Sequence, residues 1–409
     1  EVFSQEIDLL GGGTRTDWVA GVHYVRHENR NFFLEAIGPA PVSQFEEQLE
    51  NPSPETLPPF VPPLEFVEDR TVTRTDLALF GQTRVRAGDR WTLTLGGRLQ
   101  RDRATDRTTQ FWFIESREVV DDSAFTWRLG ADVRLTADHL LYGTASTGWK
   151  NGGSNPGAQI GGALDVPPFF RPEEVLAFEL GSRSTLARGR AHLNLNLFLY
   201  DYDNYQFIQE DPVPFSAGTG NIPRVEISGL EAELSWLAGD RLRIDGQLTA
   251  LDGTIESDLM TLDVADFLAS GFGRFTETGI EDRASLRVNL AGNEPPKLPD
   301  LTTRLTVTHT RPFASGATLT SRLEYIYRGE YQYRVFNNPA VDTVPAYSTF
   351  GLFFGWDPAR SPVSLALRAT NLLDEAGVNS RFTNPFGLHT TSDELIPPRQ
   401  VVVTVGYRF

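Results

Sequence analysis

The stretch PPRQVVVTVGYRF, residues 397–409, alternates between apolar side chains and small or polar ones. Its apolar positions are Val401, Val403, Val405, Tyr407 and Phe409. A period of two is the pattern of a β-strand whose two faces meet different surroundings. Because free chain ends normally fray into solvent, a chain that stops inside such a strand predicts a strand paired along both edges, as in a closed barrel.

The same alternation recurs along the chain, while helical spacing is not sustained over any comparable stretch. In WTLTLGGRLQ (91–100), Trp91, Leu93 and Leu95 share one face, and Thr92 and Thr94 share the other. The chain is therefore predicted to be all-β. Fifteen strands are predicted, at roughly 2–9, 16–27, 72–86, 90–104, 124–136, 138–149, 173–185, 189–207, 224–237, 240–253, 300–311, 317–333, 346–357, 361–373 and 397–409.

The connections between these strands alternate in length. Every second one is a short turn, at 10–15, 86–90, 135–139, 186–190, 237–241, 312–316 and 357–362. The others are long, at roughly 28–71, 105–123, 150–172, 208–223, 253–299, 334–345 and 374–396. Short turns at one end and long loops at the other describe an antiparallel transmembrane β-barrel of the bacterial outer membrane. A soluble all-β binding protein made of two packed sheets is an alternative, since its strands also alternate.

Composition narrows the function. The 409 residues carry a net charge of -17 with a sequence pI near 4.9, which argues against nucleic acid as a partner. Cysteine is absent, so the chain has no disulfide and no thiolate metal site. The sequence contains no nucleophile elbow, no HExxH and no phosphate-cradling loop, and its acidic stretches have no fixed ligand spacing. We therefore expect no enzyme activity, no metal site and no cofactor.

The strand count is odd. The first and the last predicted strands both run towards the end with the short turns, whereas single-chain bacterial barrels have an even number of strands. At least one strand is therefore expected ahead of Glu1. Residues 1–409 are expected to be the C-terminal part of a longer barrel.

Several segments resemble the barrel domain of TonB-dependent outer-membrane receptors, the active transporters of iron complexes, vitamin B12 and some sugars. From about residue 72 onwards their order and spacing match that family. The segments are YGTASTGWKNGGSNP (142–156), FRPEEVLAFELGSRS (170–184) with LNLNLFLYDYDNYQ (193–206), ISGLEAELSW (227–236), NEPPKLPDLTTRLTV (293–307), VPAYSTFGLFFGW (344–356), TNLLDE (370–375) and PPRQVVVTVGYRF (397–409).

The resemblance implies a 22-stranded barrel, of which about fifteen strands are present here. It also implies an N-terminal plug domain and an energy-coupling box that binds TonB, although no region of this sequence resembles either. The implied function is uptake of a scarce nutrient, most often an iron–siderophore complex, into a Gram-negative bacterium. A passive porin-type channel is the first alternative, and it would apply if the parent protein had no plug.

Five residues in the long loops or at the strand ends that lead into them are candidate ligand contacts: Trp112, Asn151, Tyr331, Tyr333 and Arg334. Aromatic rings beside arginine suit a flat anionic ligand such as an iron chelate. The alternatives are an interfacial aromatic girdle and, for Asn151, a plain turn. Further expected partners are outer-membrane lipid, lipopolysaccharide and the outer-membrane assembly machinery, for which the resemblance implies that the terminal strand from Val401 to Phe409 is the signal.

Overall fold

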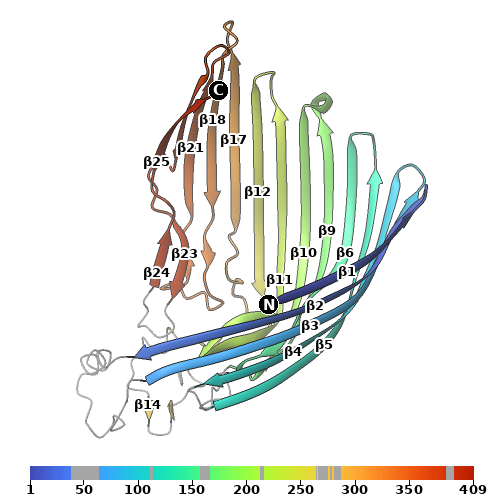
Figure 1. Ribbon diagram of the computed structural model, residues 1–409, viewed down its shortest axis with the longest axis vertical. Coiled ribbons are helices and arrows are strands. Elements are labelled where there is room, and N and C mark those ends of the chain that lie inside the picture. Colours follow the sequence, from blue (N-terminus) through green and yellow to red (C-terminus); the bar gives the residue numbers. More distant parts are fainter. Residues whose placement is uncertain are drawn as a thin grey trace.

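The structure is a computed structural model that describes residues 1–37, 64–110, 114–156, 166–211, 216–263, 265, 275–276, 279–280, 287–383 and 391–409. One antiparallel sheet of fifteen strands contains most of these residues. Each strand pairs with the next one along the chain, as Figure 1 shows. The strands are β1 (Val2–Gly12), β2 (Thr16–Ile37), β3 (Leu64–Ala87), β4 (Trp91–Gln110), β5 (Ile114–Arg134), β6 (His139–Lys150), β9 (Glu173–Leu186), β10 (Ala191–Asp211), β11 (Ser216–Leu237), β12 (Leu242–Ile255), β17 (Leu301–Pro312), β18 (Thr318–Arg328), β21 (Tyr347–Asp357), β22 (Val363–Thr370) and β25 (Gln400–Tyr407).

Short elements lie in the connections between these strands. A 3-10 turn, η2 (Ala187–Gly189), joins β9 to β10. Among the described residues, no helix is long and apolar enough to cross a membrane. The remaining strands form two-stranded sheets: β7 (Gly153–Ser154) with β8 (Phe169–Phe170), β13 (Met260–Leu262) with β16 (Arg287–Asn289), β14 (Phe275–Thr276) with β15 (Gly279–Ile280), β19 (Tyr331–Gln332) with β20 (Thr343–Val344), and β23 (Val378–Thr383) with β24 (Thr391–Leu395).

The predicted strands and short turns are confirmed. All fifteen strands are present in the predicted order, and every predicted short turn joins two neighbouring strands of the sheet. Glycines make two of these turns possible, because Gly88 and Gly316 adopt positive φ angles of 70° and 82°. The soluble alternative is wrong, since the strands form one continuous curved sheet instead of two packed ones.

The long-loop predictions are wrong at two places. The predicted loop 105–123 is almost entirely strand, because β4 continues to Gln110 and β5 begins at Ile114. The predicted loop 208–223 is likewise shortened, since β10 ends at Asp211 and β11 begins at Ser216. The strands therefore extend well past the apolar zone. Most of the predicted loop 28–71 lies outside the described residues, although β2 and β3 extend into it at both ends.

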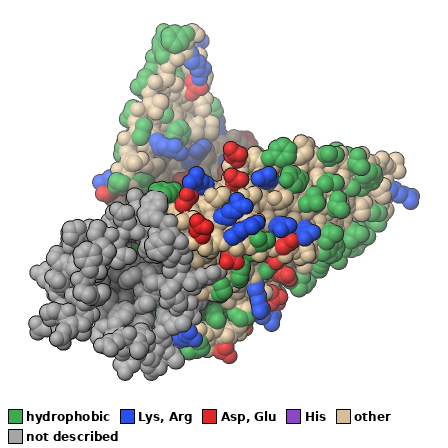
Figure 2. Space-filling view, turned by 60° about the horizontal axis from the view of Figure 1, so that its bottom comes forward, with side chains coloured by type: hydrophobic (Ala, Val, Ile, Leu, Met, Phe, Trp, Pro, Cys, Tyr) green, Lys and Arg blue, Asp and Glu red, His purple; other side chains and the backbone are tan. Residues whose placement is uncertain are grey.

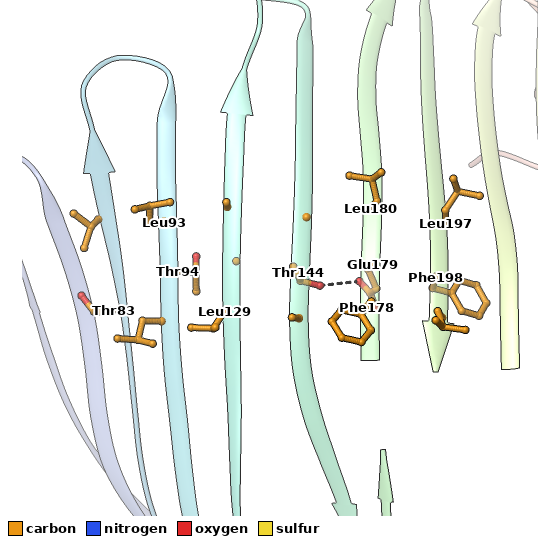
Figure 3. Close-up of a pocket in the computed structure, with 17 residues that line it drawn as sticks. Thr83, Leu93, Thr94, Leu129, Thr144, Phe178, Glu179, Leu180, Leu197 and Phe198 are labelled. Atoms are coloured by element: carbon orange, nitrogen blue, oxygen red, sulfur yellow. Dashed lines mark hydrogen bonds between the residues drawn. The ribbon is translucent and has the colours of Figure 1, made fainter. Parts of the chain in front are cut away.

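The outer face of the sheet carries a continuous apolar band. Register places Thr83, Leu95, Leu129, Ala145, Phe178 and Leu199 in one row across six strands. Leu95 and Leu129 are 56% and 47% exposed, which is the environment of a side chain that faces lipid. A hollow of about 880 Å³ lies in this band (Figure 3). Its leucine lining suits acyl chains, and it faces away from the polar inner wall.

The sheet divides towards the end with the long loops. β5 pairs with β4 along almost all of its length but with β6 only over Arg128–Arg134. Beyond that point the two strands diverge, so that β1–β5 lean away from the remaining strands in Figure 1. One side-chain contact marks the division, a hydrogen bond of 3.0 Å from the Trp127 backbone N–H to the Thr147 hydroxyl.

The terminal strand forms one edge of the sheet. In the described chain β25 pairs only with β22, where Val403 lies opposite Leu367, and β1 pairs only with β2. The side chains of Val401, Val403, Val405 and Tyr407 are 59% to 67% exposed, and the rings of Tyr407 and Phe409 lie 5.1 Å apart. Closure of a barrel by this strand stays a prediction.

Candidate functional site

The inner face of the sheet is a polar wall with three adjoining hollows. The first, about 500 Å³, is lined by Tyr142, Arg183 and Glu231, among others. It shares Asn194, Glu233 and Gln247 with a second hollow of about 290 Å³, which shares Arg304 with a third of about 450 Å³. The hollows therefore form one belt from β6 to β25, which we call the inner belt. Alternate side chains of the same strands supply the lipid-facing band and this wall.

Charge is unevenly distributed along the inner belt. On β9 and β11 the inner face carries Glu179, Glu231 and Glu233 against one arginine, Arg183. The hollow at β17–β25 instead contains three guanidinium groups, from Arg304, Arg322 and Arg368, and one carboxylate, from Glu324. Arg304 donates hydrogen bonds to Glu324, and the Arg322 guanidinium lies 5.7 Å from the centre of the Phe353 ring. This arginine hollow is suited to an anionic group.

The segment after β6 folds back against the inside of the sheet, and Asn155 fixes it there. The Asn155 side chain is 6% exposed. It donates hydrogen bonds of 2.8 Å to the carbonyls of Pro167 and Thr219, and its oxygen accepts one of 2.9 Å from the Thr219 N–H. Gly153 allows close approach of this segment, since a Cβ there would lie 2.3 Å from the Phe170 ring. One asparagine thus joins the two ends of this loop to β11.

An arginine and carboxylate cluster on the inner face of β3 and β4 holds the same segment. Arg70 binds Asp106 through two guanidinium nitrogens, Nη2 at 2.5 Å and Nε at 3.0 Å. The Ser154 hydroxyl donates a hydrogen bond to Asp106 at 2.9 Å. Four residues further along each strand, Arg74 lies 3.3 Å from Asp102. Arg74 also donates a hydrogen bond to the Gly152 carbonyl. The two arginines therefore connect the strand wall to the folded-back segment.

In the described part of the chain, Asp102 is the member of this cluster whose carboxylate is buried without hydrogen bonds. Its side chain is 1% exposed, and within the described residues neither carboxylate oxygen has a hydrogen-bond partner. Burial, together with the carboxylates of Asp76, Asp122 and Asp121, raises the Asp102 pKa to about 6 against the opposing charge of Arg74. Asp102 lies beyond Leu99, the last residue of the apolar outer row on β4, and is therefore outside the membrane-spanning part of the strand.

The raised pKa predicts a pH-dependent stability. Between the ordinary value and about 6, the folded state binds a proton that the unfolded state releases, so this contribution favours folding at low pH and is lost as pH rises through 6. From pH 7.5 to pH 5 the free energy of unfolding of the wild type should rise, relative to Asp102→Asn, by about 1.4 kcal/mol. Denaturant unfolding in lipid vesicles at both pH values measures this. Asp89→Asn, in an exposed turn, is the control and should show no such difference.

A second cluster joins three loops at the long-loop end. The Arg334 side chain is 10% exposed and binds two buried carboxylates. Its Nε lies 2.6 Å from Asp342 and its Nη1 2.7 Å from Asp263, whose side chains are 0% and 2% exposed. Burial raises the pKa of the Asp342 carboxyl. Arg381 extends the network by donating a hydrogen bond of 2.7 Å to the Thr343 carbonyl. It also donates to the Asp393 carboxylate, and that hydrogen bond lowers the Asp393 pKa.

The predicted ligand contacts lie in different environments. Tyr331 is 6% exposed and packs with Val344 and Val378, so it belongs to a small loop core. Arg334 is occupied by its two carboxylates, and Tyr333 has the Lys297 ammonium 5.4 Å from its ring centre. Tyr331 and Tyr333 thus belong to one packed loop core, whereas Arg334 belongs to the ion-pair cluster with Asp263 and Asp342.

Asn151 and Trp112 do not join that cluster. Asn151 is half-buried and accepts a hydrogen bond of 2.7 Å from Gln206 through its backbone carbonyl. Trp112 lies outside the described residues. Binding by any of the five candidates stays a prediction.

Sequence reasoning missed the residues that position the loops. Asn155, Asp102 and Asp263 each act through a partner far along the chain. The one signal that was available is the polar run QRDRATDRTTQ (100–110), whose alternate positions Asp102 and Asp106 fall on the inner face. In the described part of the chain, no group of three or more His, Asp or Glu side chains has an arrangement that could hold a metal ion.

A curved antiparallel sheet with an apolar outer band, a polar inner wall and long loops at one end defines an outer-membrane β-barrel. The chain belongs to the TonB-dependent receptor β-barrel family, because the family model described as TonB dependent receptor-like, beta-barrel matches residues 3–372. Proteins of this family lie in the outer membrane of Gram-negative bacteria. They are transport receptors that bind small-molecule ligands such as iron chelates and interact with TonB.

Solved structures share this fold at low sequence identity. The ferric yersiniabactin uptake receptor FyuA from Yersinia pestis is 16% identical, with a TM-score of 0.71 over 99% of this chain and 54% of that one. The siderophore receptor PiuA from Acinetobacter baumannii is 16% identical, with a TM-score of 0.68 over 99% and 55%. The copper transporter OprC is 13% identical, with a TM-score of 0.65 over 99% and 56%. The chain thus spans about half the length of these structures.

Proposed function

We propose that the chain forms the C-terminal section of the barrel of an active transport receptor that takes up an iron chelate of the siderophore type. The observation that carries this proposal is the family match over residues 3–372. The names of the ferric yersiniabactin receptor and the siderophore receptor among the similar structures support an iron chelate as the ligand.

The inner belt supplies chemistry that suits such a ligand. Ferric chelates are commonly anionic, and Arg304, Arg322 and Arg368 place three delocalised cations around one hollow. Guanidinium groups bind carboxylate and phenolate oxygens in a planar, two-pronged way that ammonium groups do not reproduce. On this proposal the arginine hollow contacts the chelate on its way through the barrel.

The parent protein would contain the parts that the resemblance implies. We propose that it carries a plug domain, a TonB-binding box and further barrel strands, since the present chain spans only about half the length of the similar structures. Energy for uptake would come through TonB. The terminal strand from Val401 to Phe409 would close the barrel and present the assembly signal. Lipopolysaccharide, outer-membrane lipid and the assembly machinery complete the proposed partners, and nucleic acid is not among them.

Uptake of radioactive iron by a strain that lacks the parent gene tests the proposal. Cells are given a panel of iron chelates, with copper as a separate arm, and the wild-type gene is restored from a plasmid. We expect uptake of one chelate to be lost in the deletion strain, and lost equally in a strain without TonB. Unchanged uptake of every chelate would show that the iron-chelate assignment is wrong. Loss in the deletion strain with full uptake in the absence of TonB would favour the passive channel.

A further inference from the structure

The outer face changes character abruptly above the apolar band on β2–β5. On β4 the outward residues are Trp91, Leu93, Leu95, Gly97 and Leu99, and the next two are Arg101 and Arg103. A tilted strand crosses the hydrocarbon core in about 9–11 residues, so these arginines lie at the far headgroup level. β4 begins at a short turn, which places that level in the external leaflet.

Register brings two arginines together around a threonine. Arg26 on β2 lies opposite Thr75 on β3, and Thr75 lies opposite Arg103 on β4. The Cα atoms of the two arginines are therefore about 10 Å apart, a distance that their long side chains can bridge from both sides. The small Thr75 leaves space between them and offers a hydroxyl. Further out, Arg30, Thr71 and Arg107 have the same register, but Arg30 is hydrogen-bonded to Asp69 at 3.0 Å and 2.6 Å.

Arg26 and Arg103, which flank Thr75, are available to bind a ligand. The Arg26 side chain is 58% exposed, and among the described residues its ion pair is a long contact of 3.8 Å with Glu28. Arg103 is exposed and lies opposite Asp121, but that carboxylate accepts two hydrogen bonds of 2.8 Å from Arg101. Within the described residues Arg103 has no carboxylate within 4 Å, although its charge adds to the hydrogen bonds and charge of Arg101 in lowering the Asp121 pKa. The pair therefore offers two donors that point into the solvent-exposed headgroup zone.

The basic character is local. Above the apolar band, the outer face of β2–β5 carries six arginines and, among the described side chains, four carboxylates, those of Glu28, Asp69, Glu115 and Asp121. The arginines are Arg26, Arg30, Arg101, Arg103, Arg107 and Arg117. Asp69 binds Arg30 and Asp121 binds Arg101, so the surplus of positive charge is at the remaining arginines. At the same height on β9–β12 the outer face is acidic, with Arg224 among Glu174, Asp201, Asp203, Glu226 and Asp252. In Figure 2 the part that projects to the right has green apolar side chains towards its tip and charged ones nearer the undescribed residues.

We propose that Arg26, Thr75 and Arg103 form a binding site for a phosphate group of an outer-leaflet glycolipid, that is, of lipopolysaccharide. The chain as a whole has a charge of -17, so a surplus of arginines at one membrane level stands out and would attract an anionic partner there. Two guanidinium groups and a hydroxyl supply the donors that a phosphate accepts. The proposal rests on the outer-membrane location of the chain and is independent of the transported ligand, so a failed uptake experiment leaves it standing.

Binding of rough-type lipopolysaccharide to the purified full-length receptor, in detergent with a chelator of divalent cations, tests this site. Replacing both arginines, in Arg26→Gln with Arg103→Gln, should weaken binding at least about tenfold, because two charge-assisted contacts are lost. Lipopolysaccharide stripped of its phosphates should bind the wild type as weakly as intact lipopolysaccharide binds the variant. Phosphatidylglycerol vesicles provide the comparison with an ordinary anionic lipid.

The matched control is Arg224→Gln, an outward arginine at the same height that is hydrogen-bonded to Asp201 at 2.9 Å and 2.8 Å. Its binding should equal that of the wild type. Unchanged binding in the double variant, equal loss in the control, or equally tight binding of phosphatidylglycerol would each overturn the proposal. Heat-modifiable gel mobility reports barrel folding. If the double variant does not fold, Arg103→Lys keeps the charge without the planar fork and should still bind more weakly than the wild type.

Discussion

Replacing Arg334 by alanine is expected to loosen the loops at the long-loop end. The change leaves Asp263 and Asp342 as two buried carboxylates without a cation, at 2% and 0% exposure. Removing one partner of a buried ion pair costs about 3–5 kcal/mol, because the remaining charge stays desolvated. Amide hydrogen exchange within residues 329–346 and 256–263 should accelerate by several orders of magnitude. Exchange within the sheet below should stay as it is in the wild type.

Two further variants distinguish charge from packing in this cluster. Adding Asp263→Asn and Asp342→Asn to Arg334→Met removes all three charges, and it should restore much of the lost protection. Arg399→Ala removes an exposed pair, in which Arg399 lies 3.8 Å from Asp374, and should cost less than about 1 kcal/mol. If Arg334→Ala exchanges like the wild type, the loops are held by other contacts.

Replacing Asn155 by alanine is expected to detach the folded-back segment from β11. The variant loses three hydrogen bonds at a site that is 6% exposed, and it leaves the Pro167 and Thr219 carbonyls and the Thr219 N–H without their partner. Each such unsatisfied buried group costs about 1–3 kcal/mol, so local stability should fall by at least about 3 kcal/mol. Protease cleavage within residues 150–172 of the purified protein in detergent measures this.

Asn151→Ala is the matched comparison, four residues earlier in the same segment. In the described structure its side chain makes no hydrogen bond, so cleavage should be unchanged. The pair of variants also separates two roles. If Asn151 contacts the transported ligand, its variant lowers uptake without changing cleavage. Equal cleavage of the Asn155 variant and the wild type would mean that the segment is held mainly by Arg70 and Arg74.

The strands were predictable because lipid imposes a simple pattern on them. Every second residue of a membrane-crossing strand must be apolar, as Leu93, Leu95 and Leu99 are, and that rule can be read without a partner sequence. This alternation is not required in the parts of the strands that lie outside the membrane. Beyond Leu99 both faces of β4 become polar, so the last part of the strand, from Thr105 to Gln110, resembled a loop although it is fully paired.

The site was only partly predictable for a related reason. The aromatic and arginine residues at 331–334 resemble an exposed ligand contact. Whether they are buried depends on which other loop segments pack against them. The partner of Arg334 is Asp263, 71 residues away in the sequence, and no local pattern connects the two. The role of Asn155 was equally unpredictable, because its side chain bonds to Thr219, which is 64 residues away in the sequence.

The inner belt has an electrical consequence for whatever occupies the barrel. Carboxylates on β9 and β11 face the lumen on one side of the sheet, and guanidinium groups on β17–β22 face it further along. Such an arrangement sets up a transverse field across a space with low-dielectric walls. A dipolar body inside the barrel would feel a torque about the barrel axis, so these strands would favour some rotational settings of that body over others before any contact is made.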